Sequence, residues 1–288
     1  MQQALESPAR TALLPLKRWC TQYSVLAALA AAVLNVGGFV LIGRNVDWNS
    51  PTAFNLLAKG LSVAVIVAVL FGLGWLRSAW VTTPVREWDR KWPLYLVPGL
   101  VVIGLNLTGL KLDELTFSAG RVFEWVIDNL FTGLWEEFLT RSLMLYILYR
   151  VWGHTMAGAR KAIVVAGVLF GLAHLVNLLG SGTVSEVLTQ VTYAAIVGIF
   201  FGAVIIKTGS IWPGVIVHAL IDMASSTSTF LHSSRNAWGD TYSSDSTLTA
   251  ADVIVTLGVV LVIVGIPAVF LLRNPPTISR QPDLADRK

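Results

Sequence analysis

The stretch LFTGLWEEFLTRSLMLYIL (residues 130–148) has the length and apolar character of a membrane span, yet it contains Glu136, Glu137 and Arg141. About twenty apolar residues are needed to cross a bilayer as a helix. A charge at the centre of a span costs about 2.5–3.5 kcal/mol on insertion scales, so three charges in one span indicate a use. The stretch therefore predicts a transmembrane helix that carries a polar site.

The composition of the whole chain supports a membrane protein. Of the 288 residues, 55% are hydrophobic and only 13% are charged, whereas a soluble domain carries about 25% charged residues. The net charge of +4 comes from basic residues that separate apolar runs, so we expect a lipid bilayer as partner and no nucleic acid. Cys20 is the only cysteine, which excludes an intramolecular disulfide and a cysteine-based metal cluster. We predict an all-α, polytopic transmembrane helical bundle.

Apolar windows of membrane length give about eight spans. The third contains Pro98 and Asn106, the fourth is overlong, and the seventh is short and polar. The predicted spans are 24–43, 56–76, 93–110, 123–149, 162–179, 187–206, 210–226 and 253–272.

The distribution of positive charge orients these spans. With eight spans and a cytoplasmic N-terminus, 15 of the 21 Lys and Arg residues fall in cytoplasmic segments and five in outer segments, among them Lys59. This bias is what the positive-inside rule requires. We therefore expect an integral protein of the plasma membrane with both termini in the cytoplasm. Its parts would be a cytoplasmic segment (1–23), a transmembrane domain (24–273) with a motif-bearing core (about 123–223), and a disordered cytoplasmic tail (274–288). The polar loop 226–252 is expected to be an outer connector.

The charges of the fourth span predict a division of roles. Glu137 and Arg141 are i,i+4 neighbours on a helix and can form a carboxylate–guanidinium pair. Glu136 is rotated by about 100° from Glu137 and can face another partner. We expect Arg141 to neutralise Glu137, which leaves Glu136 as a base or metal ligand. The alternative is a buried ion network that only joins helices.

Two later spans each contribute a histidine with a polar neighbour. His174 and Asn177 share a helix face, so the asparagine is placed to orient the imidazole or to bind a substrate carbonyl. His218 and Asp222 are i,i+4 neighbours, and a carboxylate beside a histidine fixes its tautomer; a direct ligand role for Asp222 stays open. Phe170, one turn before His174, is expected to be core or pocket wall.

The residues Glu136, His174 and His218 are expected at a similar depth in the membrane. Counted from the cytoplasmic ends of their spans, Glu136, His174 and His218 all lie about 16–21 Å into the bilayer at 1.5 Å per residue. Together they can activate a water, either on a divalent metal such as zinc held by these three side chains or directly through a glutamate base.

The three motifs Glu136-Glu137-x-x-x-Arg141, Phe170-x-x-x-His174 and His218-x-x-x-Asp222 resemble those of the CPBP intramembrane proteases. That family includes type II CAAX prenyl endopeptidases and bacterial proteins linked to bacteriocin processing or self-immunity. The resemblance implies that Glu136 and His174 activate the attacking water and that His218 and Asp222 complete the catalytic group. Glu137 and Arg141 would support this group. Phe170 and Asn177 are also expected to support it, because they lie close to His174 in the sequence.

The sequence thus predicts an intramembrane endopeptidase that acts on a peptide or a membrane-associated protein. One alternative is a non-catalytic immunity or scaffold protein that keeps the motifs for structure. Another is a proton-coupled transporter with Glu136 and the histidines as a relay, which the missing inverted repeat disfavours.

Overall fold

The chain folds into a bundle of helices. The computed structural model describes residues 13–45, 51–108, 110–180, 183–231 and 249–278, and these contain helices and turns but no strand. The helices are α2 (Leu14–Gln22), α3 (Ser24–Asn45), α4 (Pro51–Gly72), α5 (Trp92–Leu107), α6 (Ala119–Glu137), α7 (Tyr146–Trp152), α8 (Met156–Ala173), α9 (Val184–Thr208), α10 (Trp212–Leu231), α11 (Ala250–Val260) and α12 (Ile266–Leu272).

Short irregular helices extend or link the main ones. A π-helical segment, Phe138–Leu145, joins α6 to α7, and a second, Leu261–Gly265, joins α11 to α12. A 3₁₀ segment, His174–Leu179, continues α8, and single 3₁₀ turns occur at Val85–Glu87 and Leu112–Glu114.

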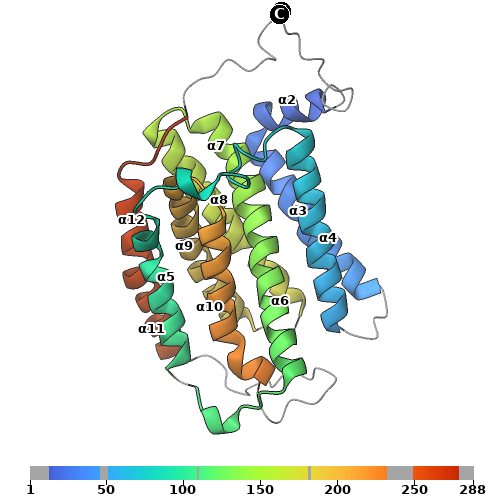
Figure 1. The fold of residues 1–288 in the computed structure, drawn as a ribbon, viewed down its shortest axis with the longest axis vertical. Helices are drawn as coiled ribbons and strands as arrows, with labels where there is room; N and C mark the ends of the chain where they lie inside the picture. The colour runs from blue at the N-terminus through green and yellow to red at the C-terminus, as the bar shows by residue number, and fades with distance from the viewer. Residues whose placement is uncertain (1–12, 46–50, 109, 181–182, 232–248, 279–288) are drawn as a thin grey trace, which may run out of the picture.

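The predicted spans overlap the helices of the bundle (Figure 1), and three of them, 123–149, 162–179 and 253–272, continue over more than one helical segment. Five helical segments of the described chain are long and apolar enough to cross a membrane, and α5 is a shorter apolar helix. The fold is therefore the predicted all-α, polytopic bundle of an integral membrane protein.

Two helical passes are not among these candidates and carry ionisable residues: α6 with its π-helical continuation into α7, and α10. Figure 1 shows α6 and α10 side by side at the centre of the bundle. Gly133 of α6 lies against Ala219 of α10, where an added Cβ would stand 3.0 Å from the Ala219 nitrogen. Small residues allow transmembrane helices to approach closely in this way, so these two helices form a tight central pair.

The contact between α8 and α9 is also built from small residues. A Cβ on Gly167 would lie 2.6 Å from the backbone nitrogen of Ile199, and a Cβ on Gly198 would lie 3.0 Å from the Gly167 backbone. Close helix packing accounts for Gly198. Gly209 ends α9 with a φ of 74°, a conformation that glycine adopts without steric cost, and α10 then begins at Trp212.

One prediction about the edges of the bundle needs correction. Lys59, assigned to an outer segment, lies within α4 and is buried, and its ammonium pairs with Asp128 of α6. The first residues of the predicted tail contact the bundle: the Tyr149 hydroxyl donates to the Pro276 carbonyl at 2.7 Å, and the Ile278 amide donates to the Gly153 carbonyl at 3.0 Å. Residues 1–12, the rest of the tail and most of the 226–252 loop lie outside the described residues.

Cys20 has no chemical role that the structure supports. It is buried at the end of α2 among apolar neighbours, and burial raises the pKa of its thiol. A thiol in apolar surroundings is a weak nucleophile, so Cys20 acts as a small core residue.

Candidate active site

The two adjacent glutamates are placed at the point where the helix changes its winding. Glu136 and Glu137 are the last residues of α6, and the π-helical segment begins at Phe138. Single π-helical turns inside α-helices are frequent at functional sites. Adjacent residues of an α-helix point about 100° apart, and the two carboxylates accordingly differ: the side chain of Glu136 is 22% exposed, toward a cavity, whereas that of Glu137 is fully buried.

Glu137 binds two partners from different helices. Its Oε1 lies 3.2 Å from Nη1 of Arg141 and 2.8 Å from Nδ1 of His218. The Arg141 pairing is the one that the i,i+4 spacing predicts. The contact with His218 of α10 is one that the sequence gave no means of predicting.

Arg141 is held in place by aromatic rings as well as by Glu137. It is 2% exposed, and its guanidinium carbon lies 4.3 Å from the ring centroid of Phe170 and 5.8 Å from that of Phe201. Its Nη1 also donates to the hydroxyl of Thr140. Cation–π contacts strengthen when they are desolvated, so Phe170 contributes to the site as a partner of this buried cation.

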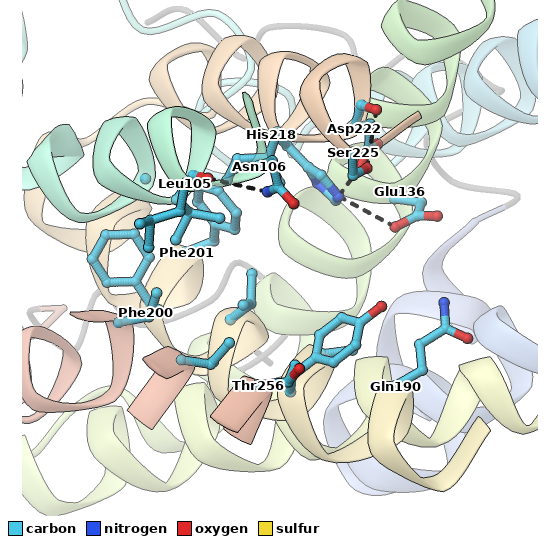
Figure 2. Close-up of a pocket in the computed structure, with 18 of the residues that line it drawn as sticks. Leu105, Asn106, Glu136, Gln190, Phe200, Phe201, His218, Asp222, Ser225 and Thr256 are labelled. Atoms are coloured by element: carbon cyan, nitrogen blue, oxygen red, sulfur yellow. Dashed lines mark hydrogen bonds and ion pairs between the residues drawn. The ribbon is translucent and has the colours of Figure 1, made fainter. Parts of the chain in front are cut away.

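His218 is oriented by Glu137 and faces two further carboxylates. A carboxylate only accepts hydrogen bonds, so the contact with Glu137 places a proton on Nδ1 of His218. The other nitrogen, Nε2, lies 3.6 Å from Oε2 of Glu136 and 3.7 Å from Oδ2 of Asp222 (Figure 2). The ring also stacks on Phe201 at 5.5 Å. Asp222 is near His218 as predicted, but Glu137 is the residue that fixes the imidazole.

His174 lies at the junction of α8 with its 3₁₀ continuation. Its Nδ1 is 3.0 Å from the Phe170 carbonyl oxygen, and because a carbonyl only accepts, this nitrogen carries a proton. The rings of His174 and His218 both meet Phe170 edge-on, at 4.9 and 6.2 Å between centroids. The three spans thus bring Glu136, His174 and His218 to one place, as their matched depths predict.

The amide nitrogen of Asn177 contacts Gln190 and not the imidazole of His174. Its Nδ2 donates to Oε1 of Gln190 at 2.8 Å, which links the 3₁₀ segment to α9. Gln190 was missed by sequence reasoning, because it is a single glutamine in an apolar helix with no motif around it.

A cavity of about 770 Å³ opens beside these side chains. Glu136, His174, His218 and Asp222 line it, together with Asn129 and other polar residues of α6, α9 and α10. Oδ2 of Asp222 is buried and has no hydrogen-bond partner among the described residues. A buried carboxylate oxygen calls for a partner, and at this position a water or a substrate group would supply it.

The metal prediction stays a prediction. Among the residues that the structure describes, no group of three or more His, Cys, Asp or Glu side chains is arranged to hold a metal ion.

Comparison with known proteins identifies the segment that holds the site. Residues 118–224 match the family model described as type II CAAX prenyl endopeptidase Rce1-like. This match confirms the resemblance predicted from the three motifs, and it implies an intramembrane endopeptidase. No curated protein and no solved structure matches the chain.

Proposed function

We propose that this protein, whose residues 118–224 belong to the Rce1-like family of type II CAAX prenyl endopeptidases, hydrolyses a peptide bond with a water activated by Glu136, His174 and His218. The observation that supports the proposal most strongly is the placement of His218: Glu137 anchors Nδ1 at 2.8 Å, while Nε2 faces Glu136 across 3.6 Å. An anchored imidazole next to a cavity-facing carboxylate is an arrangement suited to acid–base catalysis.

The distances around His218 suit a bridging water. Separations of 3.6 and 3.7 Å from Nε2 to Glu136 and Asp222 exceed those of direct hydrogen bonds. A polar contact of this length is commonly bridged by water. We infer that a water bound between Glu136, His218 and Asp222 is the nucleophile.

The reaction then needs one proton carrier. The water oxygen attacks the carbonyl carbon while Glu136 takes the water proton. When the tetrahedral intermediate collapses, the C–N bond breaks and Glu136 delivers that proton to the leaving amine nitrogen. His174 and His218 flank the reacting atoms and hold the water and the carbonyl oxygen in line. Glu137 and Arg141 act as positioning residues, because they touch His218 and Phe170 instead of the cavity.

The test follows the incorporation of solvent oxygen. Purified full-length protein is incubated in ¹⁸O-labelled water with a detergent-solubilised extract of its own cell membranes, and new peptide ends are identified by mass spectrometry. We expect ¹⁸O in the new carboxylates. Glu136→Gln should lower the rate about 10²–10⁴-fold, the usual contribution of a general base, and His174→Ala and His218→Ala should also lower it.

The matched control is Glu87→Gln, which neutralises an exposed glutamate paired with Arg77 far from the cavity. It should cleave like wild type. The proposal fails if Glu136→Gln is as active as Glu87→Gln while both variants stay folded. Treatment with a chelator, followed by metal analysis of the purified protein, tests the predicted zinc or other divalent ion separately.

A further inference from the structure

The proposed reaction places negative charge on the carbonyl oxygen of the scissile bond. When the water attacks, one electron pair of the C=O double bond moves to that oxygen, and hydrogen-bond donors that point at it lower the barrier. Holding the reacting groups in line does not by itself supply such a donor. The site therefore needs side chains that can donate a hydrogen bond into the cavity.

The side chains already assigned to the reaction are mainly acceptors. Glu136 and Asp222 are carboxylates, which only accept when they are ionised. His174 carries its proton on Nδ1, beside the Phe170 carbonyl, so Nε2 of the neutral ring is an acceptor. His218 can donate from Nε2 only when its ring carries two protons, and that nitrogen also faces Glu136 and Asp222 at 3.6 and 3.7 Å. A further donor is therefore needed.

Most of the other polar residues that line the cavity direct a proton along their own helices. Five such side chains donate to a backbone carbonyl three or four residues earlier in the chain. They are Asn106, Asn129, Thr132, Ser225 and Ser226. Among the described lining residues, the polar side chains that remain are Gln190, Tyr193 and Thr256. Thr256 belongs to α11, which carries none of the catalytic side chains, so the two residues of α9 are the better candidates.

Tyr193 combines a donor with a position beside the reacting groups. It is half-buried on α9 and lines the cavity. The charges of Asp222 and Glu136 both act on its hydroxyl, which therefore lies close to the two carboxylates. A phenolic hydroxyl donates one hydrogen bond and can accept others.

Gln190 orients the Tyr193 hydroxyl. The two residues are three apart on α9, so their side chains share a face of the helix, and they form a side-chain hydrogen bond. Oε1 of Gln190 accepts from Nδ2 of Asn177 at 2.8 Å, which leaves the Nε2 donor of Gln190 for the Tyr193 oxygen. A hydroxyl that accepts from Nε2 keeps its own proton for a group in the cavity. Hydrogen bonds in such a chain strengthen one another.

We propose that Tyr193 is a further catalytic residue, whose hydroxyl donates a hydrogen bond to the oxyanion of the tetrahedral intermediate. Gln190, supported by Asn177, is its positioning residue. The inference rests on the proposed function, because the oxyanion exists only if water attacks a carbonyl here. Tyr193 keeps its proton throughout. Its hydrogen bond strengthens as the C=O double bond opens and weakens when that bond is restored and the C–N bond breaks.

The experiment compares Tyr193→Phe with wild type in the ¹⁸O cleavage assay described above. The variant keeps the ring and loses only the hydroxyl. The rate of ¹⁸O incorporation is followed over a series of dilutions of the membrane extract, which separates the rate at saturation from the extract concentration at half-saturation. We expect the saturated rate to fall about 10²–10³-fold, the usual cost of removing one oxyanion donor. Half-saturation should stay unchanged, because the hydroxyl acts in the transition state.

The matched control is Tyr23→Phe. Tyr23 is exposed, lies between α2 and α3, and accepts a hydrogen bond from a glutamine amide, Nε2 of Gln22, at 3.0 Å. It is not among the residues that line the cavity, so this variant should cleave like wild type. Rates are expressed per amount of folded protein, measured by size-exclusion chromatography and thermal unfolding in detergent micelles.

Gln190→Ala tests the positioning role. It should lower the saturated rate less than Tyr193→Phe does, because the hydroxyl remains but is no longer oriented. The double variant Gln190→Ala/Tyr193→Phe should be no slower than Tyr193→Phe alone, since residues that act through one group are not additive. A double variant slowed by the product of the two single effects would contradict the chain from Asn177 to Tyr193.

The outcomes separate this inference from the proposed function. If wild type forms no ¹⁸O-labelled carboxylates, the proposed function fails, and the role of Tyr193 fails with it. If wild type cleaves, Glu136→Gln does not, and Tyr193→Phe is as fast as Tyr23→Phe, the proposed function stands and the role of Tyr193 is wrong. A Tyr193→Phe variant with a higher half-saturation and an unchanged saturated rate also overturns that role, because the hydroxyl would then bind substrate and transition state equally.

Discussion

The helices at the edge of the bundle differ from those at its centre in the side chains that they carry and in what surrounds those side chains. The helix α3 presents large apolar side chains outward, such as Leu34 at 76% exposure, and meets the hydropathy expected of a span. The central helices α6 and α10 are not among the candidate spans, and they contain Glu136, Glu137, His218 and Asp222. Charged residues are tolerated at bilayer depth when protein instead of lipid surrounds them. In this protein, therefore, helices that carry ionisable residues hold the candidate site at the centre of the bundle.

The largest expected effect is that of removing the central cation. Arg141→Met leaves the fully buried Glu137 carboxylate without its counter-charge, and breaking a buried pair from one side costs about 3–5 kcal/mol. Thermal unfolding in detergent micelles measures the loss. The double variant Glu137→Gln/Arg141→Met should be more stable than Arg141→Met alone. Arg77→Ala, which breaks an exposed pair, should cost less than about 1 kcal/mol; equal losses for the two arginines would remove the contrast between centre and surface.

A smaller loss is expected from the second charged link, between α4 and α6. The Lys59 ammonium contacts Asp128 at 2.9 Å and Thr132 at 2.7 Å, and both charged side chains keep slight exposure. Lys59→Met should therefore lower the free energy of unfolding by about 1–3 kcal/mol, the cost of leaving a buried polar group unpaired. Adding Asp128→Asn should recover part of the loss. A variant as stable as wild type would show that this pair is solvated.

The close contact between α6 and α10 predicts that Gly133→Ala lowers the free energy of unfolding by about 1–3 kcal/mol. The added methyl would overpack against Ala219. The matched substitution Gly104→Ala on α5, where no atom lies within 4 Å of the new Cβ, should leave stability equal or slightly higher. Chemical denaturation of the two variants side by side makes the comparison. If Gly133→Ala is neutral, α6 and α10 are packed less tightly than the structure shows.

The smallest effect belongs to the edge of the bundle. Leu34→Ala on the outward face of α3 should change the free energy of unfolding by less than about 0.5 kcal/mol, because few protein contacts are lost. The same unfolding measurement in micelles applies. A loss of several kcal/mol would mean that this face contacts protein, for example in an oligomer, instead of lipid.

Much of the fold follows from the sequence because the bilayer restricts the choices. A window of about twenty apolar residues has to be a helix, since backbone groups in lipid must be satisfied internally. This reasoning predicted the polytopic helical bundle, including the helix that carries Glu136. It assigned Lys59 to an outer segment, because charge counting treats a basic residue near a span end as a loop residue and has no knowledge of Asp128 as its partner.

The candidate site was predictable in part for a similar reason. Helical rise alone brings Glu136, His174 and His218 to one depth, and the i,i+4 spacing alone pairs Glu137 with Arg141. No comparable rule predicts how each helix is rotated about its own axis. The sequence therefore could not show that Glu137 reaches His218 or that Gln190 receives the amide of Asn177.

By itself the sequence determined the class of fold, and it predicted a common depth for the polar residues and a family resemblance, because these depend on composition, spacing and local motifs. Only the tertiary structure decided which nitrogen of His218 is anchored, which carboxylate stays open to the cavity, and that Glu136, His174 and His218 line one cavity. The physical reason is that these features arise between helices distant in the chain, where side-chain packing sets the rotation and approach of each helix.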